Sequence, residues 1–298
     1  MSASSPLAAA AGPADAPASE VRGLGALRRG LGWSPRSALV LAAVYVLSAL
    51  TALLQGAVLR LAPGAWHVLP RTLSRIVTWL VGVRVARFGT PAAGPVLFVA
   101  NHISWIDIPV LSAGTGAAFI AKKEIEGWSG MGVMARRYRS VFVDRTRRHA
   151  SAAQRDEILE RLRAGDSLVL FAEGTSTDGT AIAPFKSALF AVAQALPDLK
   201  VQPVSIVYTH INGIPVTRAR RPLLGWYGDM ELTGHVWRAL ALGRIRAEIH
   251  CHRPLTMREA GSRKALAERC RNAVARGLEA ARSGRSTAIS GPSAGAPS

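Results

Sequence analysis

The chain has 298 residues, of which 49% are hydrophobic and 19% are charged, which fits one globular catalytic domain with an appendage, or two small domains. Disorder throughout is excluded by this composition, and a disulfide-rich scaffold is excluded because Cys251 and Cys270 are the only cysteines. A net charge of +18, from 37 Lys and Arg against 19 Asp and Glu, indicates an anionic partner, either nucleic acid or a membrane surface. The apolar surplus favours the membrane.

Both ends of the chain have compositions typical of disorder. Residues 1–35 begin with a stretch rich in Ala, Pro and Ser and then carry several arginines, and residues 283–298 are rich in Gly, Ser, Ala and Pro. Such segments bury too little apolar surface to offset the conformational entropy lost on folding. We therefore expect a disordered basic tail at the N-terminus and a disordered tail at the C-terminus.

Residues 36–83 have the pattern of a membrane anchor. Residues 38–59 contain no charge, and at ~1.5 Å per helical residue this run just crosses a bilayer core of about 30 Å. A cleaved signal peptide fits poorly, because 37 residues precede the run. A second, shorter apolar stretch follows at 76–83, and arginines flank the segment on both sides. The sequence predicts a helical hairpin in one leaflet or a full span, and the positive-inside rule does not separate the two.

Residues 84–282 alternate short apolar runs with helical patterns. The runs typical of buried strands are 95–100, 118–121, 141–143, 167–172, 201–208 and 245–250. Helical patterns lie at 151–164, which stops at Gly165, and at 185–196. This alternation predicts an α/β domain with a mixed, largely parallel sheet flanked by helices.

The end of the first strand carries a histidine and an aspartate. His102 and Asp107 follow the apolar run 95–100, and ligands of α/β sheets bind at the carboxyl ends of strands. Histidine is the usual general base at neutral pH and needs a partner that fixes its tautomer, which a carboxylate does. The alternative is structural: Asp107 caps a helix and His102 is a satisfied core residue.

Two later strand ends carry polar groups as well. The run 141–143 is followed by Asp144 and Arg145, which can form a structural ion pair, or leave Arg145 to bind a phosphate or carboxylate with its guanidinium. The run 167–172 is followed by Glu173-Gly174-Thr175-Ser176. Its glycine allows close backbone approach and its hydroxyls are donors, although a plain turn explains the same residues.

Taken in order, these blocks resemble the lysophospholipid acyltransferase family, typified by 1-acylglycerol-3-phosphate acyltransferase. The blocks are Asn-His-x4-Asp at 101–107, Phe-Val-Asp-Arg at 142–145, Phe-Ala-Glu-Gly-Thr at 171–175 and Val-Gln-Pro-Val at 201–204. The resemblance covers about residues 84–250. It implies a membrane-bound O-acyltransferase that moves a fatty acyl group from acyl-CoA or acyl carrier protein to the hydroxyl of 1-acylglycerol-3-phosphate.

The resemblance also implies roles for individual residues. His102 removes the proton from the lysolipid hydroxyl, Asp107 orients His102, and the hydroxyl oxygen attacks the thioester. Arg145 and the loop 173–175 hold the acceptor's head group, and the family's basic residue after the second strand corresponds to Lys122. The predicted substrate-binding residues are Asn101, Ser104, Lys122, Arg145, Glu173, Gly174, Thr175, Ser176 and Lys186.

One departure from the family's pattern affects the acceptor. Ser176 stands where the glycerol-phosphate enzymes usually have an arginine, and Ala172 stands where they have a proline. Because a guanidinium is the better partner for a phosphate, the alternative acceptor is lyso-ornithine lipid, a zwitterionic aminolipid handled by a bacterial branch of the family. Lys186 can still supply positive charge to the head group.

The remaining expectations concern partners and location. We expect membrane lipids as partners and the cytoplasmic membrane as location, with the active site facing the cytoplasm. We expect no metal and no redox cofactor; His250-Cys251-His252 has no second ligand pair to complete a metal site. A non-enzymatic basic protein that binds nucleic acid or a membrane surface is the distant alternative, but no nucleic-acid-binding motif occurs, so nucleic acid is not expected as a partner.

Overall fold

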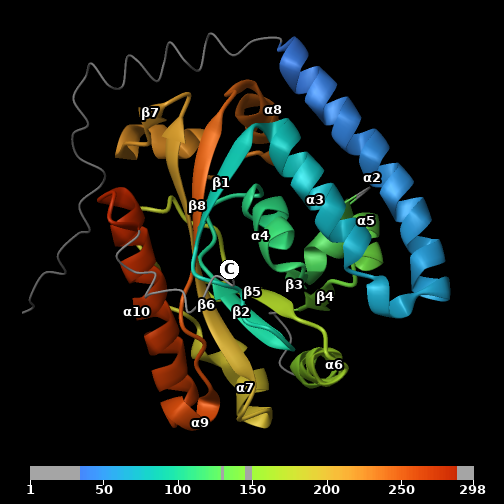
Figure 1. The fold of residues 1–298 in the computed structure, drawn as a ribbon, viewed down its shortest axis with the longest axis vertical. Helices are drawn as coiled ribbons and strands as arrows, with labels where there is room; N and C mark the ends of the chain where they lie inside the picture. The colour runs from blue at the N-terminus through green and yellow to red at the C-terminus, as the bar shows by residue number, and fades with distance from the viewer. Residues whose placement is uncertain (1–33, 129–130, 145–149, 287–298) are drawn as a thin grey trace, which may run out of the picture.

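A computed structural model describes residues 34–128, 131–144 and 150–286 (Figure 1). The strands form one sheet in the order β1-β8-β6-β2-β5-β3-β4, and β7 pairs with the end of β6. Neighbouring strands are parallel except where β6 meets β8 and β7, so the predicted mixed, largely parallel sheet is confirmed. The strands are β1 (Val83–Phe88), β2 (Val96–Ala100), β3 (Ala118–Lys122), β4 (Val141–Val143), β5 (Leu168–Phe171), β6 (Lys200–Ile211), β7 (Ile214–Pro215) and β8 (Ile245–Cys251).

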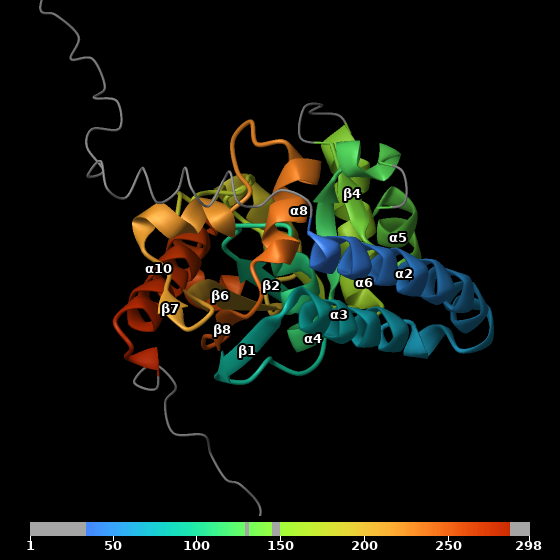
Figure 2. The same cartoon turned by 90° about the horizontal axis from the view of Figure 1, so that it is seen from above.

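Helices cover both faces of the sheet. Helices α3 and α4 lie on one face with α2 outside them, and α7, α9 and α10 lie on the other (Figures 1 and 2). The α-helices are α2 (Pro35–Leu61), α3 (Val68–Val81), α4 (Asp107–Thr115), α5 (Met131–Arg137), α6 (Ala150–Arg163), α7 (Ala191–Ala195), α8 (Leu232–Ala241), α9 (Met257–Ala260) and α10 (Arg263–Arg282). Short 3-10 helices are η1 (Pro63–Ala65), η2 (Lys123–Gly127), η3 (Ser187–Phe190) and η4 (Arg218–Leu223).

Strand β2 shows how the sheet separates two hydrophobic cores. All of its residues are buried, and successive side chains of a strand point to opposite faces. Leu97 and Val99 belong to the core under α7 and α10, whereas Val96, Phe98 and Ala100 belong to the core under α3 and α4. A strand buried on both faces reads as a continuous apolar run, which is why the sequence revealed it.

Strand β6 contains a β-bulge near its carboxyl end. Its pairing with β8 shifts between Tyr208 and His210, so that Thr209 has no partner in the register. Before the bulge, Ile206 and Tyr208 point into the core under α3 and α4, and after it Ile211 points into the same core. An extra residue re-aims the side chains that follow it. Even-numbered side chains of β6 therefore face this core before the bulge, and odd-numbered side chains face it after the bulge.

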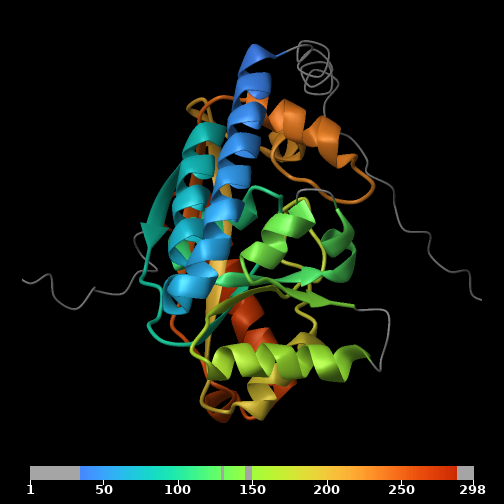
Figure 3. The same ribbon diagram turned by 90° about the vertical axis from the view of Figure 1, so that its right-hand side faces the viewer.

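Helices α2 and α3 form an antiparallel hairpin that packs along one side of the domain (Figure 3). The buried residues of α2 are mostly polar: Ser37 donates to the carbonyl oxygen of Trp237 at 2.9 Å, and Gln55 donates to that of Trp66 at 2.8 Å. Seven large apolar side chains of α2 are exposed, namely Leu39, Tyr45, Val46, Leu50, Leu53, Leu54 and Leu61. This is the reverse of the pattern of a helix on a water-soluble domain.

The turn of the hairpin is fixed to the domain through Trp66. The indole Nε1 of this buried residue donates to Asp166 Oδ1 at 2.8 Å. Arg139 and Arg161 both donate to Asp166 Oδ2, and their guanidinium groups lie 5.5 and 5.8 Å from the Trp66 ring centroid. Since Ser37 contacts α8 near the other end of α2, the helix is attached to the domain near both of its ends.

The structure corrects the sequence prediction at three places. The domain begins with an edge strand, β1, which the sequence did not reveal. The helix expected at 185–196 is shorter and begins as the 3-10 helix η3. The first residues of the expected tail 283–298 pack on the domain: Ser286 is 6% exposed and its hydroxyl donates to the Glu248 carboxylate of β8. Residues 287–298, and residues 1–33 of the expected N-terminal tail, lie outside the described residues.

Candidate active site

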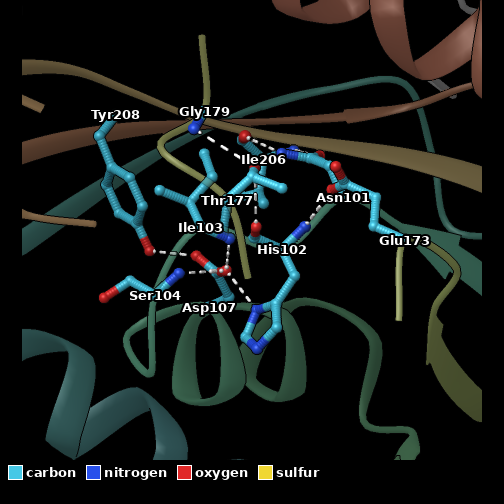
Figure 4. A network of polar contacts seen from close by, with 10 residues as sticks. All are labelled: Asn101, His102, Ile103, Ser104, Asp107, Glu173, Thr177, Gly179, Ile206 and Tyr208. Carbon is cyan, nitrogen blue, oxygen red and sulfur yellow. Dashed lines mark hydrogen bonds and ion pairs between the residues drawn. The ribbon is translucent and has the colours of Figure 1, made fainter. Parts of the chain in front are cut away.

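His102 and Asp107 form a hydrogen-bonded pair at the carboxyl end of β2 (Figure 4). The His102 Nδ1 atom lies 2.9 Å from Asp107 Oδ2, and the His102 side chain is 16% exposed while that of Asp107 is fully buried. A carboxylate accepts, so Nδ1 carries the hydrogen and the Nε2 atom is the basic nitrogen. The ring is also held from its side, because it stacks on Phe171 with centroids 3.9 Å apart.

Asp107 is held by three further donors. Its Oδ2 accepts from the backbone N–H groups of Ile103 and Ser104 at 2.6 and 2.8 Å, and its Oδ1 accepts from the Tyr208 hydroxyl at 2.6 Å. Burial and the adjacent carboxylate raise the pKa of Tyr208 well above its ordinary value, so the phenol remains a donor. These contacts fix the carboxylate both toward the imidazole and within the loop that precedes α4.

Asn101 joins the catalytic loop, which is residues 101–106 between β2 and α4, to strand β6. Its Oδ1 accepts from the N–H of Ile206 at 2.9 Å and its Nδ2 donates to the Ile206 carbonyl oxygen at 3.0 Å. The side chain thereby continues the β2–β6 ladder for one more residue after the backbone of β2 has turned away. Asn101 is 1% exposed and both ends of its amide are occupied, which places it behind the site. In this arrangement Asn101 supports the residue that follows it, His102, from behind.

Glu173 holds the other side of the loop. One carboxylate oxygen accepts from the His102 N–H and the other from the Ala183 N–H, both at 2.9 Å. Burial raises the pKa of Glu173, and the two N–H donors partly oppose that rise. Glu173 is 3% exposed, so its buried carboxylate holds the backbone of the catalytic loop at His102 against the segment at Ala183. Thr177 adds to this clamp, since its N–H donates to the His102 carbonyl oxygen at 2.9 Å.

The other members of the Glu-Gly-Thr-Ser block lie at the surface of this loop. Gly174 has a φ of +79°, a left-handed conformation that favours glycine, at the point where the chain leaves β5. Thr175 is exposed and Ser176 is half-buried. Both residues thus lie beside the loop that Glu173 ties to His102.

The remaining predicted site residues are dispersed. Ser104 is buried, and its hydroxyl finds no hydrogen-bond partner among the described residues. Lys122 at the end of β3 and Lys186 just before η3 are exposed. Arg145 lies outside the described residues. Within the described ranges, no group of three or more His, Cys, Asp or Glu side chains gathers that could hold a metal ion.

Sequence reasoning missed Tyr208 and Thr177 as parts of the site. Tyr208 lies 101 residues from Asp107 along the chain, and only the pairing of β2 with β6 brings the two together. The one available signal was a tyrosine at the end of a predicted buried strand, where a polar tip needs a partner.

The geometry supports general-base chemistry at a hydroxyl. An oriented imidazole removes a proton through Nε2, and the buried Asp107 carboxylate stabilises the imidazolium that results. The pair needs no nucleophile on the protein itself, so an acceptor hydroxyl can attack directly.

Comparisons with known proteins agree with this chemistry. A family model described as Acyltransferase matches residues 84–207. The chain is 42% identical over 83% of its length to a lyso-ornithine lipid O-acyltransferase of Brucella abortus, covering 95% of that protein. It is 31% identical over 57% of its length to a 1-acyl-sn-glycerol-3-phosphate acyltransferase of Neisseria gonorrhoeae, covering 64% of it. The fold is similar to the crystal structure of the 1-acyl-sn-glycerophosphate acyltransferase of Thermotoga maritima, with a TM-score of 0.60 at 21% identity over 82% of this chain and 95% of that one. The chain is therefore an acyltransferase and belongs to the lysophospholipid acyltransferase family.

Proposed function

We propose that the chain transfers a fatty acyl group from a thioester donor, acyl-CoA or acyl carrier protein, to the hydroxyl of lyso-ornithine lipid. The observation that carries the proposal is the 42% identity to the Brucella abortus relative of that name across 95% of its length. Ser176 agrees with it, because this position lacks the guanidinium that best pairs with a phosphate. Relatives of the same name occur in Rhizobium meliloti and Rhodobacter capsulatus.

The reaction follows from the catalytic pair. His102 Nε2 takes the proton of the acceptor hydroxyl as its oxygen bonds to the thioester carbonyl carbon. The tetrahedral intermediate then collapses, the carbon–sulfur bond breaks, and the thiolate takes the proton from the imidazolium. An ester and a free thiol result, and the step requires neither a metal nor a redox cofactor. Asp107 keeps Nε2 as the base in each turnover.

1-Acylglycerol-3-phosphate is the second candidate acceptor. The Neisseria gonorrhoeae relative carries that name, and the four sequence blocks are those of its family. With serine at position 176, phosphate recognition would depend on Arg145 and Lys186. We expect activity on this acceptor to be present but modest.

The hairpin of α2 and α3 supports a membrane-attached enzyme whose helices lie in one leaflet. Helix α2 is long and apolar enough to cross a bilayer, with a mean hydropathy of 2.3 over its most apolar window. Contacts with the domain near both of its ends favour the in-plane arrangement over a span, because a spanning helix would carry one end away from the domain. Its exposed leucines would then enter the acyl region. We propose attachment to the cytoplasmic membrane, with the site facing the cytoplasm.

An assay of the two acceptors under identical conditions tests which one the enzyme prefers. Purified protein in mixed micelles is given a fixed thioester and either lyso-ornithine lipid or 1-acylglycerol-3-phosphate, and kcat/KM is measured for each. We expect at least tenfold preference for lyso-ornithine lipid, and a shift toward the phosphate acceptor in Ser176→Arg. A preference for 1-acylglycerol-3-phosphate in the wild type would overturn the proposal. A His102→Ala variant serves as the blank, because we expect it to keep the fold while lacking the base.

A further inference from the structure

A cavity of about 570 Å³ lies beside the catalytic loop. Its walls come from the carboxyl end of β6, from η4, from the last turn of α10 and from the segment that follows the Glu-Gly-Thr-Ser block. Ligand pockets are typically about 300–1,000 Å³, so the space suits a lipid head group. None of the residues predicted to bind substrate lines it, but Ser176 stands two residues before Asp178, which does.

The cavity adjoins the catalytic pair. Ile103, Gly179 and Tyr208 line it, and all three lie around His102 and Asp107 in Figure 4. Ile103 is the residue after His102, and the Tyr208 hydroxyl donates to Asp107 at 2.6 Å. A head group in the cavity would therefore lie beside the catalytic pair, on the side of Asp107.

Two guanidinium groups face the same part of the wall. Arg221 donates to Thr180 Oγ1 at 2.7 Å, and Arg282 donates to the Thr180 carbonyl oxygen at 2.7 Å and to that of Gly179. Each thus contacts only neutral oxygens, and no carboxylate within the described part of the chain lies at ion-pair distance from either one. Burial, and secondarily the charge of Arg221, lower the pKa of Arg282 to about 10.

Asp178 supplies a single negative charge on the same wall. Its carboxylate accepts from the N–H of Thr180 at 2.8 Å and from the Thr180 hydroxyl. Although burial opposes it, these bonds and the charge of Arg221 lower the pKa of Asp178 overall, so the group is ionised. The cavity therefore carries two positive charges and one negative charge.

We propose that this cavity is the acceptor's head-group subsite and recognises a zwitterionic amino-acid head group. Arg221 and Arg282 would bind its carboxylate, and Asp178 would pair with its ammonium group. The inference rests on the proposed function, in which the acceptor carries ornithine. A phosphomonoester fits less well, since Asp178 repels a dianion that has no cation of its own.

The test compares lyso-ornithine lipid with its carboxylate methyl ester, which keeps the ammonium group and loses the anion. The variants are Arg221→Gln and Arg282→Gln, and the matched control is Arg263→Gln, an exposed arginine at the opposite end of α10. We expect the wild type and the control to prefer the free carboxylate 10- to 100-fold in kcat/KM. Each cavity variant should raise the KM for the free acid by a similar factor and leave the KM for the thioester unchanged.

The methyl ester separates recognition from folding. If the arginines only support the loop at 179–180, the cavity variants lose activity on acid and ester alike and retain the preference, which overturns the inference. A rise in the thioester KM in place of the acceptor KM also overturns it, because the cavity then serves the donor. If the wild type does not turn over lyso-ornithine lipid at all, the proposed function fails and the inference fails with it; unaffected variants of an active enzyme refute the inference alone.

Discussion

Replacing Asp107 with asparagine separates the charge of the catalytic pair from its geometry. The amide oxygen can keep the contacts of Oδ2 with Ile103, Ser104 and His102, and the amide NH2 can donate to the Tyr208 oxygen, which also accepts. We therefore expect the loop to keep its shape and the free energy of unfolding to change by about 1–2 kcal/mol. What disappears is the negative charge beside the imidazole.

The size of the effect follows from the distance between the charges. With Nδ1 and Oδ2 2.9 Å apart, the delocalised charges of imidazolium and carboxylate lie about 4 Å apart. At an effective dielectric constant of about 20 this corresponds to about 4 kcal/mol. That stabilisation acts in the transition state, where the proton has moved to His102, so its loss lowers kcat about 10³-fold.

The assay is thioester consumption with saturating acceptor, run beside a thermal unfolding curve for each variant. Tyr208→Phe is the matched control, because it removes one donor to Asp107 and keeps the charge; we expect it to lose less than tenfold in kcat. The KM values for both substrates should change little in either variant. If Asp107→Asn keeps kcat within tenfold of wild type and only lowers the melting temperature, then Asp107 supports the loop and the general-base argument is wrong.

Three further outcomes follow from other contacts. Glu173→Gln should lower the free energy of unfolding by about 1–3 kcal/mol in urea titrations, because an amide NH2 must then face a backbone N–H; unchanged stability would show that the clamp is dispensable. Burial lowers the pKa of His235 and His252 to about 4 each. The unfolded chain therefore binds the extra protons between about pH 6.5 and 4, and stability should be flat above pH 6.5 and fall by about 2 kcal/mol per histidine at pH 5, a slope that His252→Asn should reduce. Trp66→Ala should expose the hairpin turn to limited proteolysis at a rate at least tenfold above wild type, and equal rates would mean that the contact with Asp166 does not hold the hairpin.

Much of the site could be predicted because parallel strands end at a common edge. His102 and Glu173 follow β2 and β5, which are neighbours in the sheet, so polar residues directly after two apolar runs had to meet. Asp107 follows His102 by five residues, so the local sequence alone was enough to predict that the two side chains can meet. The order of the blocks then pointed to the same chemistry as the geometry.

The rest depends on contacts that no local pattern encodes. Arg282, at the end of the 20-residue helix α10, reaches the carbonyl oxygens at 179–180, about a hundred residues earlier in the chain. Strand β1 is partly exposed, with the alternating sequence VRVARF, and lies at the edge of the sheet. Its mixed polarity resembles a surface segment, and only the ladder to β8 makes it a strand.

The bulge in β6 gives this strand one residue more than the ladder to β8 needs. Tyr208 pairs with Ala247 and His210 pairs with Arg246, so Thr209 could be removed without changing the partner of any other residue. Deleting Thr209 would therefore restore strict alternation while Tyr208 still faces Asp107 and Ile211 still faces the same core. The deletion would remove the bend and the added twist that a bulge gives to its strand. The extra residue thus sets the direction in which β6 runs beyond the catalytic pair, and not the face to which its side chains point.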